Sequence, residues 1–315
     1  MTSLIERYPR ENLRTNISGL LNVVSTYIRW RKLEQLKGSQ IVENYGEQIR
    51  QGLSLSSPNA TPVLVCARNE CNDLPRLLLA LSRQNVHVIV VDNASIDGTG
   101  DIAQSLGAEV IIEPKPGLSY ALASGFNHLQ EKFFDHNNKL LLLTDADTYP
   151  VAGWSESMKQ ATQTILAKKP GILTAPVVGA GNGIMQDAFR TSSALAKDIY
   201  YDIHHYINAR GPNSAILLDE EGNIINALAH HMDMEVFIGQ DQMVQDTVVE
   251  TGGIARYNWS PNAVVIMRGD RYGSINDIIR TFLNPDRIKL YADYPRPNGS
   301  VKEYYSRTRL KIGKY

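Results

Sequence analysis

Two carboxylates follow a short apolar run in the middle of the chain. Leu140–Leu143 is followed closely by Asp145 and Asp147, and Ala146 separates the two acids. Carboxylates spaced in this way can hold a hard divalent cation, and the cation can in turn hold a diphosphate. Because an isolated pair of this kind is common by chance, the surrounding sequence decides how much weight it deserves.

The elements around this pair alternate between strand and helix patterns. The four leucines are typical of a strand buried on both faces of a parallel sheet. The sequence predicts strands at 63–66, 86–91, 110–112 and 140–143, and helices at 73–84, 97–106 and 119–134. This alternation indicates an α/β fold with a mainly parallel sheet flanked by helices. In such sheets ligands bind at the carboxyl ends of the strands, where both acids are expected.

Polar segments also follow the other three predicted strands. Asp92 ends the second strand and could accept a hydrogen bond from a nucleobase or a ribose. Lys115 precedes a helix start, where a cation and the helix amides can meet a diphosphate oxygen. Taken singly, each signal is weak: Asn69 and Asp73 could be local helix caps, and most lysines are surface residues.

Together the four segments resemble the inverting glycosyltransferase family 2 pattern, which belongs to the GT-A, Rossmann-like fold. The matching segments, in chain order, are 67–70, 90–99, 115–117 and 143–147. The resemblance covers residues 61–160 and is thinner over 161–272. It implies an enzyme of the hexosyltransferase type that moves a sugar from a nucleotide diphosphate sugar, most commonly a UDP-sugar, to an acceptor hydroxyl.

The resemblance also implies roles for particular residues of the first half. It assigns the base pocket to Ala67, Arg68, Glu70 and Asp92, the ribose to Asp145, the phosphate to Lys115, and Mg²⁺ or Mn²⁺ to Asp147, with Ala146 between the two acids. Trp154 resembles the family's Pro-x-x-Trp element beside the sugar.

Two weaker matches lie in the second half. Asn213, within Gly211–Ala215, resembles a loop near the donor sugar and the acceptor. Asp241 resembles the catalytic base of the family's Glu-Asp motif, although Gln240 replaces the first acid. The alternative for Asp241 is a helix N-cap.

Two arginines, Arg268 and Arg271, follow the last predicted strand. Their fork-shaped guanidinium groups suit a clamp on the diphosphate, which similar enzymes close with a late loop. Several relatives place a metal-binding histidine in this late region, and none follows Met267 here. His230 and His231 are the substitutes if their loop folds back toward the acids.

The expected mechanism is a displacement with inversion at the anomeric carbon. Asp241 would take the proton of the acceptor hydroxyl as that hydroxyl attacks from the face opposite the leaving diphosphate. Retention stays open, because some proteins with this core retain configuration. A nucleotidyltransferase is a second reading, although Cys66–Asn72 has no glycine. A non-catalytic nucleotide-sugar-binding protein is a third, kept open by Gln240.

The chain divides by composition into three parts. Residues 1–58 form a predicted N-terminal helical extension, residues 59–272 the GT-A domain, and residues 273–315 a basic, tyrosine-rich tail. The domain comprises a nucleotide-sugar-binding half (59–160) and an acceptor-binding half (161–272). A Ser-, Pro- and Asn-rich stretch at 52–62 indicates a linker. The helix expected near 17–28 packs on the domain or serves as a membrane-surface or homodimer helix.

Bulk properties exclude several other classes of protein. The 315 residues carry a net charge of −1, which gives no nucleic-acid signal. Two cysteines without a CxxC spacing indicate a reducing compartment, and no apolar run approaches the roughly 18 residues that span a bilayer. We expect a cytoplasmic protein, with a position against the inner membrane face as the alternative. The sequence is compatible with three kinds of acceptor: a small molecule, a natural-product scaffold or a lipid phosphate.

Overall fold

The computed structural model describes residues 13–54, 60–132, 139–181, 183, 187, 191, 211–233 and 240–268. Two helices open the chain, α2 (Leu13–Leu33) and α3 (Gly38–Ser54). A run of alternating strands and helices follows, as the sequence predicts: β1 (Thr61–Ala67), α4 (Leu74–Leu81), β2 (Val86–Asn93), α5 (Thr99–Ser105), β3 (Glu109–Glu113), α6 (Leu118–Lys132) and β4 (Leu140–Asp145).

The second half is built from shorter elements. They are β5 (Thr148–Pro150), α7 (Trp154–Ile165), β6 (Gly171–Thr174), β7 (Val177–Ala180), the 3₁₀ turn η1 (Gly211–Asn213), β8 (Ser214–Leu217), α9 (Asn223–Met232), α10 (Gln240–Glu250), β9 (Ile254–Tyr257), the 3₁₀ turn η2 (Pro261–Ala263) and β10 (Val265–Arg268). The sequence also favours a pair of helices over residues 187–208, and nearly all of these residues lie outside the described part of the chain.

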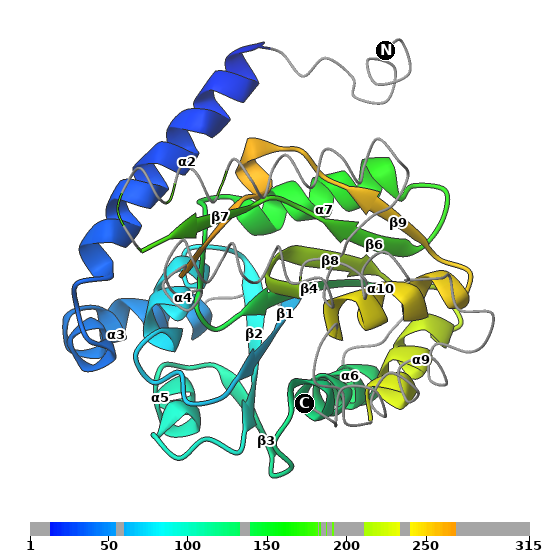
Figure 1. Ribbon diagram of the computed structural model, residues 1–315, viewed down its shortest axis with the longest axis horizontal. Coiled ribbons are helices and arrows are strands. Elements are labelled where there is room, and N and C mark those ends of the chain that lie inside the picture. The colour runs from blue at the N-terminus through cyan, green and yellow to red at the C-terminus, as the bar shows by residue number, and fades with distance from the viewer. Residues whose placement is uncertain are drawn as a thin grey trace, which may run out of the picture.

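A mainly parallel sheet forms the centre of the molecule (Figure 1). Its strand order is β3-β2-β1-β4-β8-β6-β9, and only β8 runs antiparallel to its neighbours β4 and β6. A smaller sheet, β5-β10-β7, pairs β10 antiparallel with β5 and parallel with β7. The predicted α/β class, with a parallel sheet flanked by helices and a helical extension, is confirmed.

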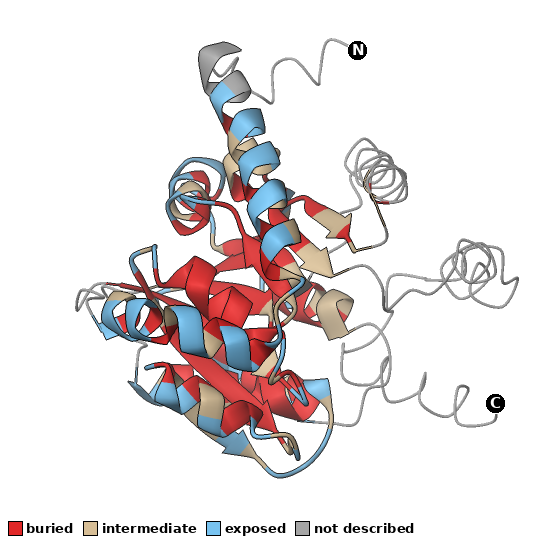
Figure 2. Ribbon diagram, turned by 90° about the vertical axis from the view of Figure 1, so that its left-hand side faces the viewer, coloured by how far each residue is buried: buried red, intermediate tan, exposed pale blue. Residues whose placement is uncertain are grey.

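Both faces of the large sheet are buried, because residues alternate between two apolar clusters along each strand. In β1, Val63 and Val65 belong to the cluster formed with α3, α4 and α7, whereas Leu64 belongs to the cluster formed with α6, α9 and α10. Figure 2 shows this buried layer running through the middle of the fold. The run of four leucines in β4 therefore fills both sides of the sheet, as predicted.

The linker predicted over residues 52–62 is wrong at both of its ends, and residues 55–59 lie outside the described residues. Helix α3 continues through Ser54, and β1 already begins at Thr61. Ile41, Ile49 and Leu53 of α3 are buried in the same cluster as β1. Burial of these apolar side chains outweighs the weak helix propensity of the Gly- and Ser-containing stretch. Among the described residues, no helix has both the length and the apolar content to cross a bilayer.

Candidate active site at the carboxyl edge of the sheet

The carboxyl ends of three adjacent parallel strands bring predicted donor-binding residues together. β1 lies between β2 and β4, and its Ala67 pairs in register with Asp92, while Cys66 pairs with Asp145. Asp92 is buried, whereas Asp145 is partly exposed. Residues from motifs far apart in the sequence thus meet at the sheet edge where open α/β folds bind their ligands.

A pocket opens at this edge, and it contains both a predicted donor ligand and the predicted base. Asp145 at the end of β4 and Asp241 in the first turn of α10 both line it. The remaining lining is mostly apolar: Leu64, Cys66, Leu118, Leu122, Leu143, Thr144, Ile172, Ser214 and Val244. Because α10 begins at Gln240, Asp241 is not the N-cap residue considered as its alternative.

The turn that carries Asp147 is fixed from both sheets. Thr148 donates a hydrogen bond of 2.7 Å from Oγ1 to the main-chain oxygen of Asp145. The main-chain N–H of Arg268, at the end of β10, donates to the main-chain oxygen of Asp147 at 3.2 Å. Ala146 is buried between the two acids, and the Asp147 side chain is partly exposed. The main chain around the acid pair is therefore held in place.

The loops after β1 and β2 are joined to each other by hydrogen bonds. The main chain of the first loop donates to side chains of the second: Asn69 to Ser95 Oγ at 3.0 Å, Glu70 to Thr99 Oγ1 at 2.8 Å, and Cys71 to Asp97 Oδ2 at 3.1 Å. Glu70 is buried beneath this junction, and Arg68 is exposed on it. The residues predicted to bind the base therefore lie in or next to two loops that hydrogen bonds hold together.

Three groups in β1 and in these two loops have shifted pKa values. Partial burial works against ionisation of Asp97, but hydrogen bonds from Thr99 and Cys71 outweigh it and lower the Asp97 pKa. The hydrogen bond to Asp97 raises the Cys71 pKa to about 11. Burial, reinforced by the Asp145 carboxylate, raises the pKa of Cys66. Both thiols are therefore protonated at neutral pH and unsuited to nucleophilic chemistry.

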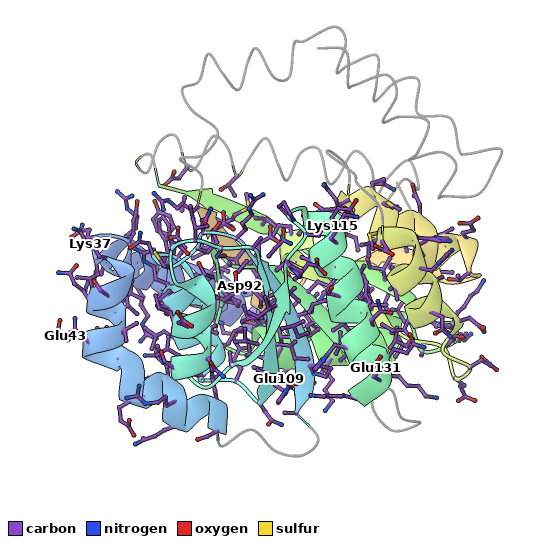
Figure 3. All side chains as sticks on the ribbon, turned by 90° about the horizontal axis from the view of Figure 1, so that it is seen from below. Lys37, Glu43, Asp92, Glu109, Lys115 and Glu131 are labelled. Atoms are coloured by element: carbon purple, nitrogen blue, oxygen red, sulfur yellow. The ribbon has the colours of Figure 1, made fainter. Side chains whose placement is uncertain are left out.

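Asn93 positions the turn that carries Lys115. Its side-chain amide donates to the main-chain oxygen of Lys115 at 2.7 Å, and its Oδ1 accepts from the Gly117 N–H at 2.7 Å. The Lys115 ammonium lies 3.6 Å from the centre of the Tyr120 ring. Figure 3 shows Asp92 within the fold and Lys115 at its edge, where α6 begins. The contact with Tyr120 raises the Lys115 pKa, so this exposed cation keeps its charge.

Trp154 and Asn213 contact each other in the interior. The Trp154 indole N–H donates to Asn213 Oδ1 at 2.8 Å, and the Asn213 amide donates to the main-chain oxygens of Pro176 and Ala263 at 2.8 and 2.7 Å. Both side chains are completely buried. In this structure they join α7 and η1 to the loop before β7 and to η2, and their predicted roles beside the sugar stay predictions.

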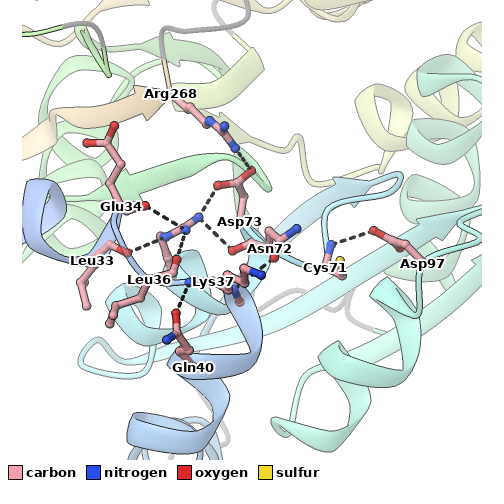
Figure 4. A network of polar contacts seen from close by, with 12 residues as sticks. Leu33, Glu34, Leu36, Lys37, Gln40, Cys71, Asn72, Asp73, Asp97 and Arg268 are labelled. Atoms are coloured by element: carbon pink, nitrogen blue, oxygen red, sulfur yellow. Dashed lines mark hydrogen bonds and ion pairs between the residues drawn. The ribbon is translucent and has the colours of Figure 1, made fainter.

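Arg268 reaches from β10 to the start of α4. Its Nη1 forms an ion pair of 2.8 Å with Asp73 Oδ2, and the other carboxylate oxygen of Asp73 pairs with Arg76 (Figure 4). Asp73 occupies the N-cap position of α4, as suggested, but its side chain makes no capping hydrogen bond. Arg268 lies next to Asp147 through its main chain, whereas its guanidinium is engaged with Asp73. To bind a diphosphate, the Arg268 guanidinium would have to give up its ion pair with Asp73.

The remaining predicted residues lie on α9 or outside the described part of the chain. Arg271 and the tail at 273–315 lie outside the described residues. His230 and His231 lie on α9, where His231 Nδ1 is 3.2 Å from Thr247 Oγ1 of α10. Across the described part of the chain, no group of three or more His, Cys, Asp or Glu side chains is arranged to hold a metal ion. A third protein ligand from α9 is therefore not supported.

Sequence reasoning missed the side chains that hold the loops. Asn93 and Ser95 fix the loops without a predicted role of their own. A signal was present for Asn93, which follows Asp92 at the end of a buried strand. An amide there can satisfy both a donor and an acceptor of a neighbouring turn.

Comparison with known proteins supports the resemblance for one segment. Residues 63–164 match the family model described as Glycosyl transferase family 2, which confirms the predicted family over that stretch. Uncharacterised glycosyltransferases of Mycobacterium bovis and Mycobacterium tuberculosis are 42% identical over 65 residues. Those residues make up 21% of this chain and 29% of each relative, so the match spans less than one third of the relatives' length.

Solved structures resemble the chain more broadly but more weakly. Glucosyl-3-phosphoglycerate synthase from Mycobacterium tuberculosis, in complex with Mn²⁺ and UDP-glucose, is 14% identical with a TM-score of 0.42, over 76% of this chain and 82% of that one. Mannosyl-3-phosphoglycerate synthase from Rubrobacter xylanophilus is 15% identical with a TM-score of 0.41, over 81% and 80%. Scores at this level support no conclusion about the activity of this chain.

Proposed function

We propose that this chain, with its family 2 segment at residues 63–164, transfers a sugar from a nucleoside diphosphate sugar to an acceptor hydroxyl. The observation that carries the proposal is the shared pocket of Asp145 and Asp241. The first residue comes from the acid pair at the end of a parallel strand, and the second from a helix of the other half. A donor held at one wall would present its anomeric carbon toward a carboxylate at the other.

On the donor side, different residues at the strand ends would bind the base, the ribose and a phosphate. Arg68, Glu70 and Asp92, on the joined loops beside Ala67, would take the base, and Asp145 the ribose. Lys115, held in position by Asn93, would neutralise a phosphate oxygen. The donor is expected to be a UDP-sugar, the commonest in the resembled family.

A divalent cation fits the chemistry of the acid pair. Asp145 and Asp147 supply carboxylate oxygens, the ligands that Mg²⁺ and Mn²⁺ prefer, and Asp147 would be the direct ligand. When bound, the cation would stabilise the negative charge that grows on the leaving diphosphate. Diphosphate oxygens and water would complete a coordination shell that the described protein groups leave incomplete.

On the acceptor side, Asp241 would act as the base. A carboxylate in the first turn of α10 can accept the proton of a hydroxyl that attacks the anomeric carbon from the side opposite the diphosphate. The anomeric configuration would then invert. The apolar walls around Asp241 would exclude water from the attacking position and limit donor hydrolysis.

The decisive experiment separates donor binding from transfer. Binding of UDP and UDP-glucose is measured by calorimetry with and without Mn²⁺, and UDP release is measured with candidate acceptors. Asp147→Asn should lose the Mn²⁺-dependent part of binding. Asp241→Asn should bind the donor normally but lose on the order of 10²–10⁴ in transfer rate.

Asp246→Asn is the matched control, since Asp246 lies on α10 outside the pocket lining. Wild-type transfer by Asp241→Asn would refute the base. Donor binding without turnover by the wild-type chain, across all acceptors, would favour the non-catalytic alternative. Pyrophosphate release from a nucleoside triphosphate would favour a nucleotidyltransferase.

A further inference from the structure

Helix α2 carries an exposed stripe of large apolar side chains. Leu20, Val24 and Ile28 recur every four residues with exposures of 60%, 55% and 53%, and Leu21 beside them is 64% exposed. Residues with this spacing share one face of a helix. We call these four side chains the α2 stripe. Exposed apolar groups gathered in this way mark a surface that contacts something other than water.

The α2 stripe is not the face by which the helix packs on the domain. Gly19 is buried so closely against η2 that a Cβ there would lie 2.4 Å from Pro261 Cγ. Trp30 is only 3% exposed, and Asn22 donates a 2.8 Å hydrogen bond to the main-chain oxygen of Ala152. In Figure 1, α2 runs along the outside of the molecule, and Figure 2 shows the exposed residues along it. The helix is therefore anchored by one face and presents the other.

The charges of α2 have a single sign. Its sequence holds Arg14, Arg29, Arg31 and Lys32 and no acidic residue, although the chain as a whole carries 33 acids and 32 lysines and arginines. Arg31 and Lys32 follow Ile28 by three and four residues, so they extend the face of the stripe by one turn. Glu34, just beyond the helix, pairs with Arg31 at 3.0 Å, and Lys32 is exposed.

We infer that α2 is a docking surface for an anionic lipid bilayer. The helix would lie parallel to the membrane plane, with the stripe among the acyl chains and Lys32 and its neighbouring arginines at the lipid phosphates. The competing occupant is a second copy of this chain. In a symmetric pairing of two α2 helices, neither helix would offer a carboxylate to the cations of the other, so that contact has no charge complementarity.

The test is flotation of the full chain with vesicles. Vesicles of pure phosphatidylcholine are compared with vesicles containing about one third phosphatidylglycerol, at low and high salt. The wild-type chain should float with the anionic vesicles only, and less so at high salt. The double variant Leu21→Ser/Val24→Ser should lose on the order of tenfold or more in partitioning, and Lys32→Gln about fivefold at low salt.

Ile112→Ser is the matched control, because Ile112 is also 64% exposed but lies on the edge strand β3. It should float like the wild type. All variants alter exposed side chains, so an unchanged urea midpoint verifies that each is folded. No flotation with anionic vesicles, or equal flotation of the stripe variant, would overturn the inference. So would a wild-type dimer in light scattering that the stripe variant converts to a monomer, since the stripe would then join two copies.

Discussion

The indole nitrogen of Trp154 lies 2.8 Å from the side-chain oxygen of Asn213, and both residues are completely buried. Asn213 also donates to Pro176 and Ala263, so its amide uses its oxygen and both of its N–H groups. One side chain thereby connects α7, the loop before β7 and the turn before β10. The packing of these three segments depends on this connection.

Asn213→Ala should destabilise the protein strongly. The change leaves the Trp154 N–H and the Ala263 main-chain oxygen without the Asn213 partner, whereas the Pro176 oxygen keeps a 3.3 Å hydrogen bond from the Val265 N–H. Because each buried unsatisfied group costs about 1–3 kcal/mol, we expect a loss of at least about 2 kcal/mol in the free energy of urea unfolding. Trp154→Phe removes one of these hydrogen bonds and should cost less. A loss below about 0.5 kcal/mol for Asn213→Ala would contradict this account of the interior.

Asn93→Ala and Lys115→Ala should differ in stability but agree in donor binding. The first removes two buried hydrogen bonds that hold the Lys115 turn, so it should cost about 2 kcal/mol of stability as well as weakening UDP binding. The second removes an exposed cation and should weaken UDP binding with a stability change within about 0.5 kcal/mol. Calorimetry with UDP and Mn²⁺ checks both variants. Normal affinity in Lys115→Ala would remove this lysine from the donor site.

Asp97→Asn should make Cys71 more reactive. The Asp97 carboxylate raises the Cys71 pKa to about 11, so almost no thiolate is present at pH 8. Replacing the carboxylate by a neutral amide brings the pKa closer to that of an ordinary thiol, and the rate of reaction with a disulfide reagent at pH 8 should rise at least about tenfold. The measurement is made in a Cys66→Ser background, which leaves one thiol to report. An unchanged rate would show that the Asp97 carboxylate does not control the reactivity of Cys71.

Acid should weaken the fold through Glu109. This carboxylate accepts from Lys132 at 2.9 Å and contacts His87 and His128, each at 2.8 Å. Partial burial opposes ionisation, but these cationic and hydrogen-bonding partners lower the Glu109 pKa from 4.5 to about 2. The folded state therefore binds the proton less readily than the unfolded chain. The resulting stability is present above pH 4.5 and is lost as the pH falls toward 2.

Glu109→Gln should reduce the loss of folding stability at acid pH. Urea unfolding between pH 5 and pH 2.5 should show a loss of roughly 2 kcal/mol in the wild type that the variant does not share, after allowance for solvent screening of a partly exposed group. Glu131→Gln, which changes an exposed acid on α6, is the control and should keep the wild-type profile. Parallel profiles for wild type and Glu109→Gln would assign the acid sensitivity to other carboxylates.

The regular first half of the fold could be predicted from the sequence. The long apolar strands β1, β2 and β4 are buried on both faces, so composition alone identifies them. The strands β5, β7 and β8 have three or four residues each, too few to show a period, and β8 reverses direction within the sheet. They form because neighbouring strands supply hydrogen-bond partners, which no local pattern reveals.

The candidate site was predictable in its residue types but not in its contacts. The carboxylates Asp92 and Asp145 could be placed because they end predicted parallel strands, whose carboxyl ends share an edge. That Arg268 pairs with Asp73 could not be foreseen, because 195 positions separate the two residues. Such a pairing depends on how β10 is placed by the smaller sheet, which is a property of the tertiary fold.

Helices α2 and α3 are tied to α4 by one buried cation. The Arg76 guanidinium donates to the main-chain oxygens of Leu33, at 3.1 Å, and Leu36, as well as pairing with Asp73, and burial lowers its pKa (Figure 4). A chain trimmed to begin at residue 60 would remove the acceptors at Leu33 and Leu36 and leave this guanidinium with only Asn72 and Asp73 as partners. We therefore expect the first two helices to unfold together with α4, and their removal to disturb Asp73, the acid that pairs with both Arg76 and Arg268.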